Sequence, residues 1–159
     1  MEARSTRARS VSPGCTKRSR APLKPPRAPW DHGVVIELLL IAAGGALGAL
    51  SRYGLASWID GRFAGRYPAG TLSVNVLGCL ILGALMAVAE DSASISPRLR
   101  LFVGVGLLGA FTTFSTFSVE TLALMREGRS GVALASVGLN LALGLGAAFV
   151  GHLAVTELA

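Results

Sequence analysis

The sequence predicts an all-α membrane protein with four transmembrane helices, and three observations support this prediction. Of the 159 residues, 52% are hydrophobic and only 15% are charged, whereas soluble domains carry roughly 25% charged residues. Apolar stretches long enough to cross a bilayer follow one another along the chain. They lack the alternation of apolar and polar residues that marks the strands of an outer-membrane barrel. Inside lipid every backbone N–H and C=O group must be hydrogen-bonded within the protein, so these stretches are predicted to be helices.

Residues 1–30 come before the first apolar stretch and differ from it in composition. Residues 1–27 hold eight Lys and Arg residues and a single acid, Glu2, which gives this segment a charge of +7 and leaves −1 for the rest. The segment is rich in Arg, Ser and Pro and has no apolar core like that of a signal peptide. We predict a disordered basic tail over 1–30 and a four-helix transmembrane domain over 31–159.

The composition also argues against several classes of function. The positive charge lies in the tail rather than on a folded face, so nucleic acid is not an expected partner. Cys15 and Cys79 lie in different environments, and no Cys or His spacing typical of a metal site occurs. The sequence shows neither a nucleophile–base pair nor a phosphate-binding loop. The protein is therefore predicted not to be an enzyme.

The first helix is predicted at about 34–57. It contains a GxxxG step at Gly44 and Gly48, and such small residues let membrane helices approach closely. The second helix, at about 71–89, has no charged residue and carries Asn75 near its start. Because a four-helix protein has little interior of its own, this abundance of small residues predicts a homodimer or another small oligomer.

The third helix is predicted at about 99–125, and its middle is unusual. Three glycines precede five hydroxyl residues within seven positions, Thr112, Thr113, Ser115, Thr116 and Ser118. Glycine costs about 1 kcal/mol in a helix, and Ser and Thr compete for backbone hydrogen bonds. One interpretation is a break near 109–113, whose freed carbonyls can coordinate a cation. The other is an intact helix whose hydroxyls bond back to the preceding turn.

The fourth helix is predicted at about 130–155, and two polar residues lie inside it. Ser136 and Asn140 are four positions apart and therefore share a helical face. Polar groups inside a bilayer are costly and usually functional. These two residues are therefore candidates for a polar path through the bundle.

Two aromatic residues of the third helix have a similar arrangement. Phe114 and Phe117 are three positions apart and share a face. There they either pack in the bundle or face lipid, or they line a path. The edge of a phenyl ring is electropositive. Ring edges, amide N–H groups and hydroxyls together can replace the hydration of a small anion without trapping it.

Three motifs resemble the Fluc (CrcB) family of fluoride channels. They are GAFTTFSTFS at 109–118, GTLSVNVLG at 70–78 and GGALGALSRY at 44–53, in the family's order, and the similarity covers about residues 34–155. The resemblance implies a dual-topology antiparallel dimer in the cell membrane that exports fluoride passively and confers fluoride resistance. Its partner would be a second copy or an oppositely oriented paralogue.

The resemblance also implies roles for individual residues. By motif position, Asn75 would be the pore asparagine, and Phe114 and Phe117 would line the fluoride path. Further pore positions are implied at Arg52, Ser115, Thr116, Glu120, Ser136 and Asn140. The backbone carbonyls of Gly109 and Thr112 would hold a structural Na⁺ at the dimer interface.

Two alternatives come from other classes of function. A proton-coupled small multidrug exporter is also a short four-helix protein, and it needs a glutamate in the membrane part of its first helix. Glu37, about one turn from the predicted helix start, is the only candidate. The hydroxyl and Phe run of the third helix has no purpose in such an exporter. The other alternative is a membrane subunit that transports nothing and uses the tail as a docking arm.

The loops give a weak signal for orientation. The side of the predicted termini carries Arg98 and Arg100, whereas the other side carries Arg62, Arg66, Arg126 and Arg129. By the positive-inside rule this nearly balanced core is compatible with insertion in both orientations. The eight basic residues of the tail would favour an N-terminus inside the cell.

Overall fold

The structure is a computed structural model, and it describes residues 32–63, 66–90 and 95–157. The described residues contain four segments long and apolar enough to cross a membrane. The prediction of an all-α, multi-pass membrane protein is confirmed over these residues. The predicted tail at 1–30 lies outside them.

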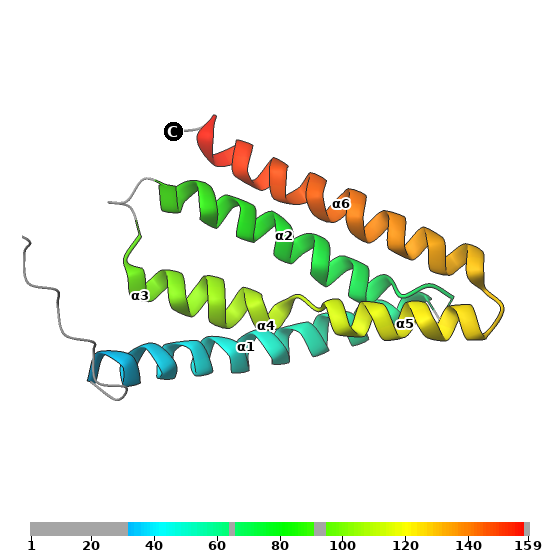
Figure 1. Cartoon of the computed structure of the whole chain (residues 1–159), viewed down its shortest axis with the longest axis horizontal. Helices are drawn as coiled ribbons and strands as arrows, with labels where there is room; N and C mark the ends of the chain where they lie inside the picture. Colours follow the sequence, from blue (N-terminus) through cyan, green and yellow to red (C-terminus); the bar gives the residue numbers. More distant parts are fainter. Residues whose placement is uncertain (1–31, 64–65, 91–94, 158–159) are drawn as a thin grey trace, which may run out of the picture.

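The four spans lie along a common long axis (Figure 1). In chain order the helices are α1 (His32–Phe63), α2 (Ala69–Glu90), α3 (Pro97–Arg100), the π-helical η1 (Leu101–Leu108), α4 (Gly109–Phe111), α5 (Phe114–Arg126) and α6 (Ser130–Thr156). The elements α3, η1, α4 and α5 together form the third span. The two ends of the described chain lie at the same end of the bundle, as four crossings require.

Helix α1 is longer than predicted, because it continues past residue 57 to Phe63. At 1.5 Å per residue it is about 48 Å long, whereas the apolar core of a bilayer is about 30 Å thick. Near its end the guanidinium carbon of Arg62 lies 3.5 Å from the ring centroid of Trp58. Trp is enriched where membrane meets water, so the last turns of α1 fit the bilayer surface.

The GxxxG step of α1 packs against the first half of the third span. A Cβ atom at Gly44 would collide with the carbonyl oxygen of Phe102, and one at Gly48 would collide with that of Leu107. Backbone therefore contacts backbone where α1 meets η1. Since this step is used within the chain, it does not itself support the predicted oligomer, which stays a prediction.

A second close approach joins α2 to α6. A Cβ atom at Gly83 would collide with the carbonyl oxygen of Ala148, and one at Gly151 would collide with that of Leu80. Small residues thus determine both of the main helix pairs in the bundle.

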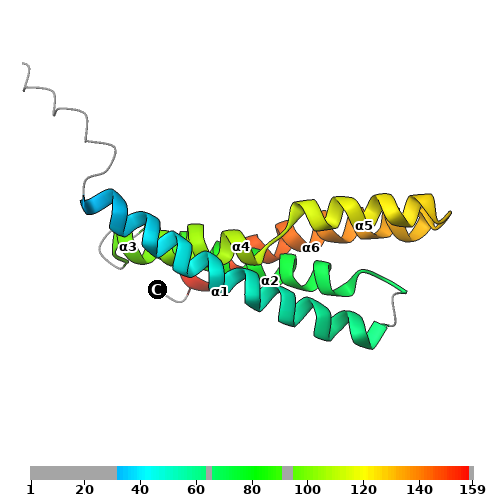
Figure 2. The same ribbon diagram turned by 90° about the horizontal axis from the view of Figure 1, so that it is seen from below.

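The third span is broken, as one interpretation of its sequence predicted. Thr112 has φ −81° and ψ 154° and Thr113 has φ −149° and ψ 112°, both extended. The alternative of an intact helix is wrong. Before the break η1 packs on α1, and after it α5 packs on α6; Figure 2 shows α5 lying alongside α6. The break therefore lets one span change its packing partner halfway across the membrane.

The π-helical turns of η1 were not predicted. The N–H of Gly109 bonds to the carbonyl of Gly104, five residues back, so the backbone is wider here than in an α-helix. Such π turns inside helices are often found at functional sites. In this chain they come directly before the break.

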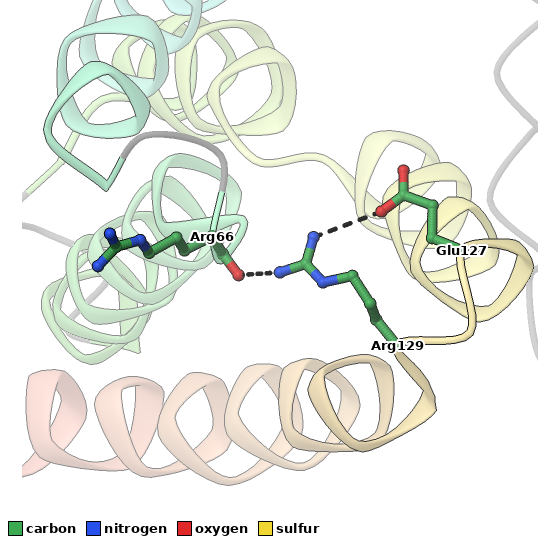
Figure 3. A network of polar contacts seen from close by, with 3 residues as sticks. All are labelled: Arg66, Glu127 and Arg129. Atoms are coloured by element: carbon green, nitrogen blue, oxygen red, sulfur yellow. Dashed lines mark hydrogen bonds and ion pairs between the residues drawn. The ribbon is translucent and has the colours of Figure 1, made fainter.

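A polar contact joins two loops at the end away from the termini (Figure 3). The guanidinium of Arg129 donates to the backbone carbonyl of Arg66 and, over 3.4 Å, to Oε2 of Glu127. At the same end, Asp60 Oδ1 accepts the N–H of Gly70 over 2.7 Å. These contacts hold the start of α2 and the turn before α6 in fixed positions.

Candidate functional site

Asn75 on α2 and Thr113 at the break are joined by two hydrogen bonds. The N–H of Thr113 donates to Asn75 Oδ1 over 2.8 Å, and Asn75 Nδ2 donates to the Thr113 carbonyl over 3.2 Å. An extended residue can exchange both of its backbone hydrogen bonds with one neighbour, as paired strands do. The Asn75 amide is that neighbour here, because the break leaves Thr113 without helical partners.

Asn75 is held in turn by α6. Its Nδ2 also donates to Asn140 Oδ1 over 3.0 Å, and Asn140 Nδ2 donates to the carbonyl of Ser136 over 3.0 Å. Ser136 is only 1% exposed. The two polar residues predicted on one face of this helix therefore support Asn75, and both hydrogens of the Asn75 amide are engaged.

The hydroxyl of Thr113 caps the start of α5. Its Oγ1 accepts the N–H of Thr116 over 3.2 Å, and the same hydroxyl donates to Thr116 Oγ1 over 2.9 Å. Ser115 Oγ lies 3.4 Å from it. Thr is a common N-cap residue for this reason, and the hydroxyl-rich run thus ends one helix segment and begins the next.

A cavity lined mainly by polar residues, which we term the vestibule cavity, lies next to the break. It has a volume of about 250 Å³ and is lined by Arg52, Tyr53, Ala56, Ser57, Asp60, Thr71, Val74, Thr113, Thr116 and Glu120. The hydroxyl of Thr71 donates to Glu120 Oε1 over 2.9 Å. Glu120 Oε2 is buried and has no hydrogen-bond partner within the part of the chain that the structure describes.

A second cavity, which we term the phenyl cavity, also borders the break and shares Thr113 with the first. It has a volume of about 270 Å³ and is lined by Asn75, Cys79, Leu82, Thr112, Thr113, Phe114, Phe117, Asn140 and Leu141. The rings of Phe114 and Phe117 have centroids 5.7 Å apart and planes inclined by 52°. Phe114 is 80% exposed, so a single chain leaves its outer side uncovered. Thr113 lines both cavities and lies between them.

Two backbone carbonyls lose their usual helical partners at the break. In an α-helix the N–H of residue 113 would bond to the carbonyl of Gly109, and that of residue 116 to the carbonyl of Thr112. Both N–H groups donate to side-chain oxygens instead, of Asn75 and Thr113 respectively. Neutral carbonyl oxygens of this kind suit a hard cation.

Side-chain metal ligands are not gathered at this site. Over residues 32–63, 66–90 and 95–157, no group of three or more His, Cys, Asp or Glu side chains could hold a metal ion. A cation bound near the break would therefore depend on backbone carbonyl and hydroxyl oxygens.

The structure brings most of the predicted site residues together around the break. Arg52, Thr116 and Glu120 line the vestibule cavity, and Asn75, Phe114, Phe117 and Asn140 line the phenyl cavity. Ser115 and Ser136 line neither cavity but contact residues that do. Glu37, the residue that the exporter alternative needs, lines neither cavity.

Sequence reasoning did not assign a site role to two residues. The sequence marks Thr113 only as one of several hydroxyl residues of the third span, and it does not predict the contact of Thr71 with Glu120. The spacing of Thr71, one helical turn before Asn75, was the available signal. It places both side chains on the face of α2 that meets the third span.

Comparison with known proteins gives a consistent result. Residues 39–152 match the family described as CrcB-like protein, Camphor Resistance (CrcB). The "Fluoride-specific ion channel FluC 2" of Symbiobacterium thermophilum is 48% identical over 112 residues, which cover 70% of this chain and 91% of the relative. The "Fluoride-specific ion channel FluC" of Thermus thermophilus is 47% identical over 114 residues, which cover 72% and 89%. That of Acidobacterium capsulatum is 43% identical over 116 residues, which cover 73% and 93%.

Proposed function

This chain belongs to the CrcB-like family, and on that basis we propose that it is a fluoride channel of the cell membrane. Neutral HF crosses a bilayer and dissociates inside a cell, so a passive anion pathway lets fluoride leave along its gradient. The observation that carries the proposal is the chain of amide, carbonyl and hydroxyl groups that joins Asn140, Asn75, Thr113 and Thr116 around the break in the third span. Those groups lie inside an otherwise apolar bundle.

The two cavities supply the proposed fluoride path. Fluoride enters the vestibule cavity beside Arg52, passes Thr113, and reaches the rings of Phe114 and Phe117 in the phenyl cavity. The phenyl ring edges, the hydroxyl hydrogen of Thr116 and the second amide hydrogen of Asn140, which is not used in its bond to Ser136, present partial positive charge without a full countercharge. Such a surface replaces hydration and still lets the ion leave, as conduction requires. The polar neighbours of this path are Ser115, Thr116, Glu120, Ser136 and Asn140.

A structural sodium ion at the break is part of the proposal. The carbonyls of Gly109 and Thr112 would hold it, and the diverted N–H groups of Thr113 and Thr116 support this assignment. A bound cation would supply positive charge near an anion path in a core whose side chains bring little.

A dimer completes the proposed channel. Phe114 is 80% exposed although it lines a cavity with Asn75, so the path needs a second wall. An antiparallel partner would supply that wall and a second, equivalent path. The partner is a second copy of this chain or an oppositely inserted paralogue.

Fluoride efflux from liposomes tests the function and the path together. The full chain is reconstituted in vesicles loaded with potassium fluoride, a potassium ionophore removes the electrical limit, and a fluoride electrode records release. We expect rapid efflux without a proton gradient. We expect efflux near the protein-free background from Phe114→Ile and from Asn75→Asp, and unchanged dimerisation in both.

The control is Phe149→Ile, which makes the same change at an exposed phenylalanine of α6 that lines neither cavity. It should release fluoride as the unmodified chain does. Vesicles that retain fluoride with the unmodified chain would contradict the function. Undiminished efflux from both site variants would contradict only the assignment of the path.

A further inference from the structure

The break in the third span does not release its carbonyls at random. A continuous α-helix joins each N–H to the carbonyl four residues back. The N–H of Thr113 would occupy the carbonyl of Gly109, but it donates to Asn75 Oδ1 over 2.8 Å. The N–H of Thr116 would occupy the carbonyl of Thr112, but it donates to Thr113 Oγ1 over 3.2 Å. Each carbonyl is thus released by one identifiable side chain.

The side chain that releases Gly109 is itself fixed on three sides. The Asn75 amide accepts from the Thr113 N–H, donates to the Thr113 carbonyl and donates to Asn140. Its oxygen and both of its hydrogens have partners, so it is a rigid part of the break. Thr113 is only 6% exposed. Water therefore cannot easily replace these hydrogen bonds.

We propose that Asn75 and Thr113 are positioning residues of the cation site, because each diverts one N–H group and so presents one carbonyl, of Gly109 and of Thr112, to a bound Na⁺. Asn140 orients Asn75 for this role from α6. This inference rests on the proposed function, since it concerns the sodium ion of that proposal. It assigns to Asn75 a second task beside the fluoride path.

The two tasks of Asn75 can be separated chemically. Diverting the Thr113 N–H needs only an acceptor oxygen, which Asp retains and Leu does not. The bonds to the Thr113 carbonyl and to Asn140 need amide hydrogens, which both substitutions remove. Asn75→Asp therefore keeps the released carbonyl of Gly109 and loses the donor, whereas Asn75→Leu loses both.

Thr113 offers an equally sharp pair. Thr113→Ser keeps the Oγ atom that accepts the Thr116 N–H, and Thr113→Ala removes it. The matched control is Thr121→Val on the same helix, whose hydroxyl only bonds back to the carbonyl of Phe117 over 2.8 Å. That substitution removes a hydroxyl of α5 without touching the break.

The measurement is the rise in melting temperature (Tm) of the detergent-purified full chain when NaCl replaces N-methylglucamine chloride. An ion that binds the folded state raises Tm by mass action. Because each variant is compared with itself in the two salts, a general loss of stability lowers both Tm values and does not change their difference. We expect a sodium-dependent rise in the unmodified chain, Thr113→Ser, Asn75→Asp and Thr121→Val. We expect most of it to disappear in Thr113→Ala and Asn75→Leu.

The outcomes separate this inference from the proposed function. An equal sodium-dependent rise in Thr113→Ala and Thr113→Ser would overturn the inference, even if Asn75→Leu fails to fold. A chain that releases fluoride from vesicles but shows no sodium-dependent rise would overturn the cation site and this inference together, and would leave the fluoride channel standing. Asn75→Asp that keeps the rise but loses efflux would support both tasks of Asn75.

Discussion

At the scale of single residues, the carboxyl group of Glu120 depends on one hydroxyl. Thr71 is only 3% exposed and donates to Glu120 Oε1 over 2.9 Å. The other oxygen, Oε2, is buried and has no partner among the residues that the structure describes. Removing the Thr71 hydroxyl would leave both oxygens of this carboxyl without a partner among the described residues, and buried unpaired polar groups are costly.

We therefore expect Thr71→Val to destabilise the folded chain by about 1–3 kcal/mol. Thermal unfolding in detergent measures this as a fall in Tm. Thr121→Val serves as the control, because its hydroxyl bonds only to a carbonyl of its own helix. Equal Tm values for the two variants would contradict the importance of the Thr71–Glu120 bond.

The residue scale also explains why Thr113 cannot be replaced by its neighbours in the run. Its backbone bonds to Asn75, and its hydroxyl caps α5. Thr112 has a hydroxyl as well, but that hydroxyl bonds back to the carbonyl of Leu108 over 3.1 Å. Adjacent residues of the same type thus close one helix segment and open the next.

At the scale of elements, the packing of α1 on η1 depends on glycine. Gly48 lies directly against the carbonyl of Leu107, with no room for a methyl group. Gly54, six residues further along the same helix, has no atom within 4 Å of the position that a Cβ would take. The two glycines therefore allow a matched comparison within α1.

We expect Gly48→Ala to destabilise the fold by about 1–3 kcal/mol, because overpacking forces the two backbones apart. Gly54→Ala should be neutral or stabilising by up to about 1 kcal/mol, since Ala favours helix over Gly. Comparison of the two Tm values in detergent measures the difference. A Gly48→Ala variant as stable as Gly54→Ala would mean that α1 and η1 do not meet so closely.

The break is likewise a property of an element and its neighbours. It moves the third span from α1 to α6, which opens the space for a cavity on each side of Thr113. A straight helix would remain against α1 and would keep its carbonyls bonded within itself. The cavities and the released carbonyls therefore have a single structural cause.

At the scale of the whole molecule, basic residues are divided between two ends. Arg62, Arg66, Arg126 and Arg129 lie in or beside the loops at one end, whereas Arg98 and Arg100 lie at the end of the described termini. Arg129 is held by the carbonyl of Arg66 (Figure 3). The described core therefore has a slight preference opposite to that of the eight basic residues at 1–27.

We expect a chain that begins at Pro29 to release fluoride as fast as the full chain, because the cavities lie within the described residues. It should also lose its preferred orientation. Reaction of Thr156→Cys with an impermeant thiol reagent, in a background of Cys15→Ser and Cys79→Ser, measures the fraction of chains on each side.

Two results would contradict this prediction, and a third would bear on the identity of the partner. Loss of efflux from a shortened chain that still inserts and dimerises would give the tail a role in conduction. An unchanged orientation would mean that the core alone sets the topology. A full chain found in one orientation only would favour an oppositely inserted paralogue as the antiparallel partner.

The number of spans and most of the polar residues of the site could be predicted from the sequence, which also placed the candidate break at 109–113 but left an intact helix open. Each of these depends on local properties. A span follows from its own hydropathy, because lipid requires each backbone to satisfy itself. The break follows from glycines and hydroxyl residues that weaken the helix where they occur. Asn75, Phe114 and Asn140 are noticeable because polar or paired aromatic groups are rare in such segments.

Which of these residues contact one another could be seen only once the helices were packed together. Asn75 and Thr113 are 38 positions apart, and Thr71 and Glu120 are 49 apart, so no periodicity within one helix pairs them. The same holds for the GxxxG step, whose partner proved to be η1 of the same chain. Packing places one particular acceptor opposite one particular N–H, and this geometry makes Thr113 a central residue of the site.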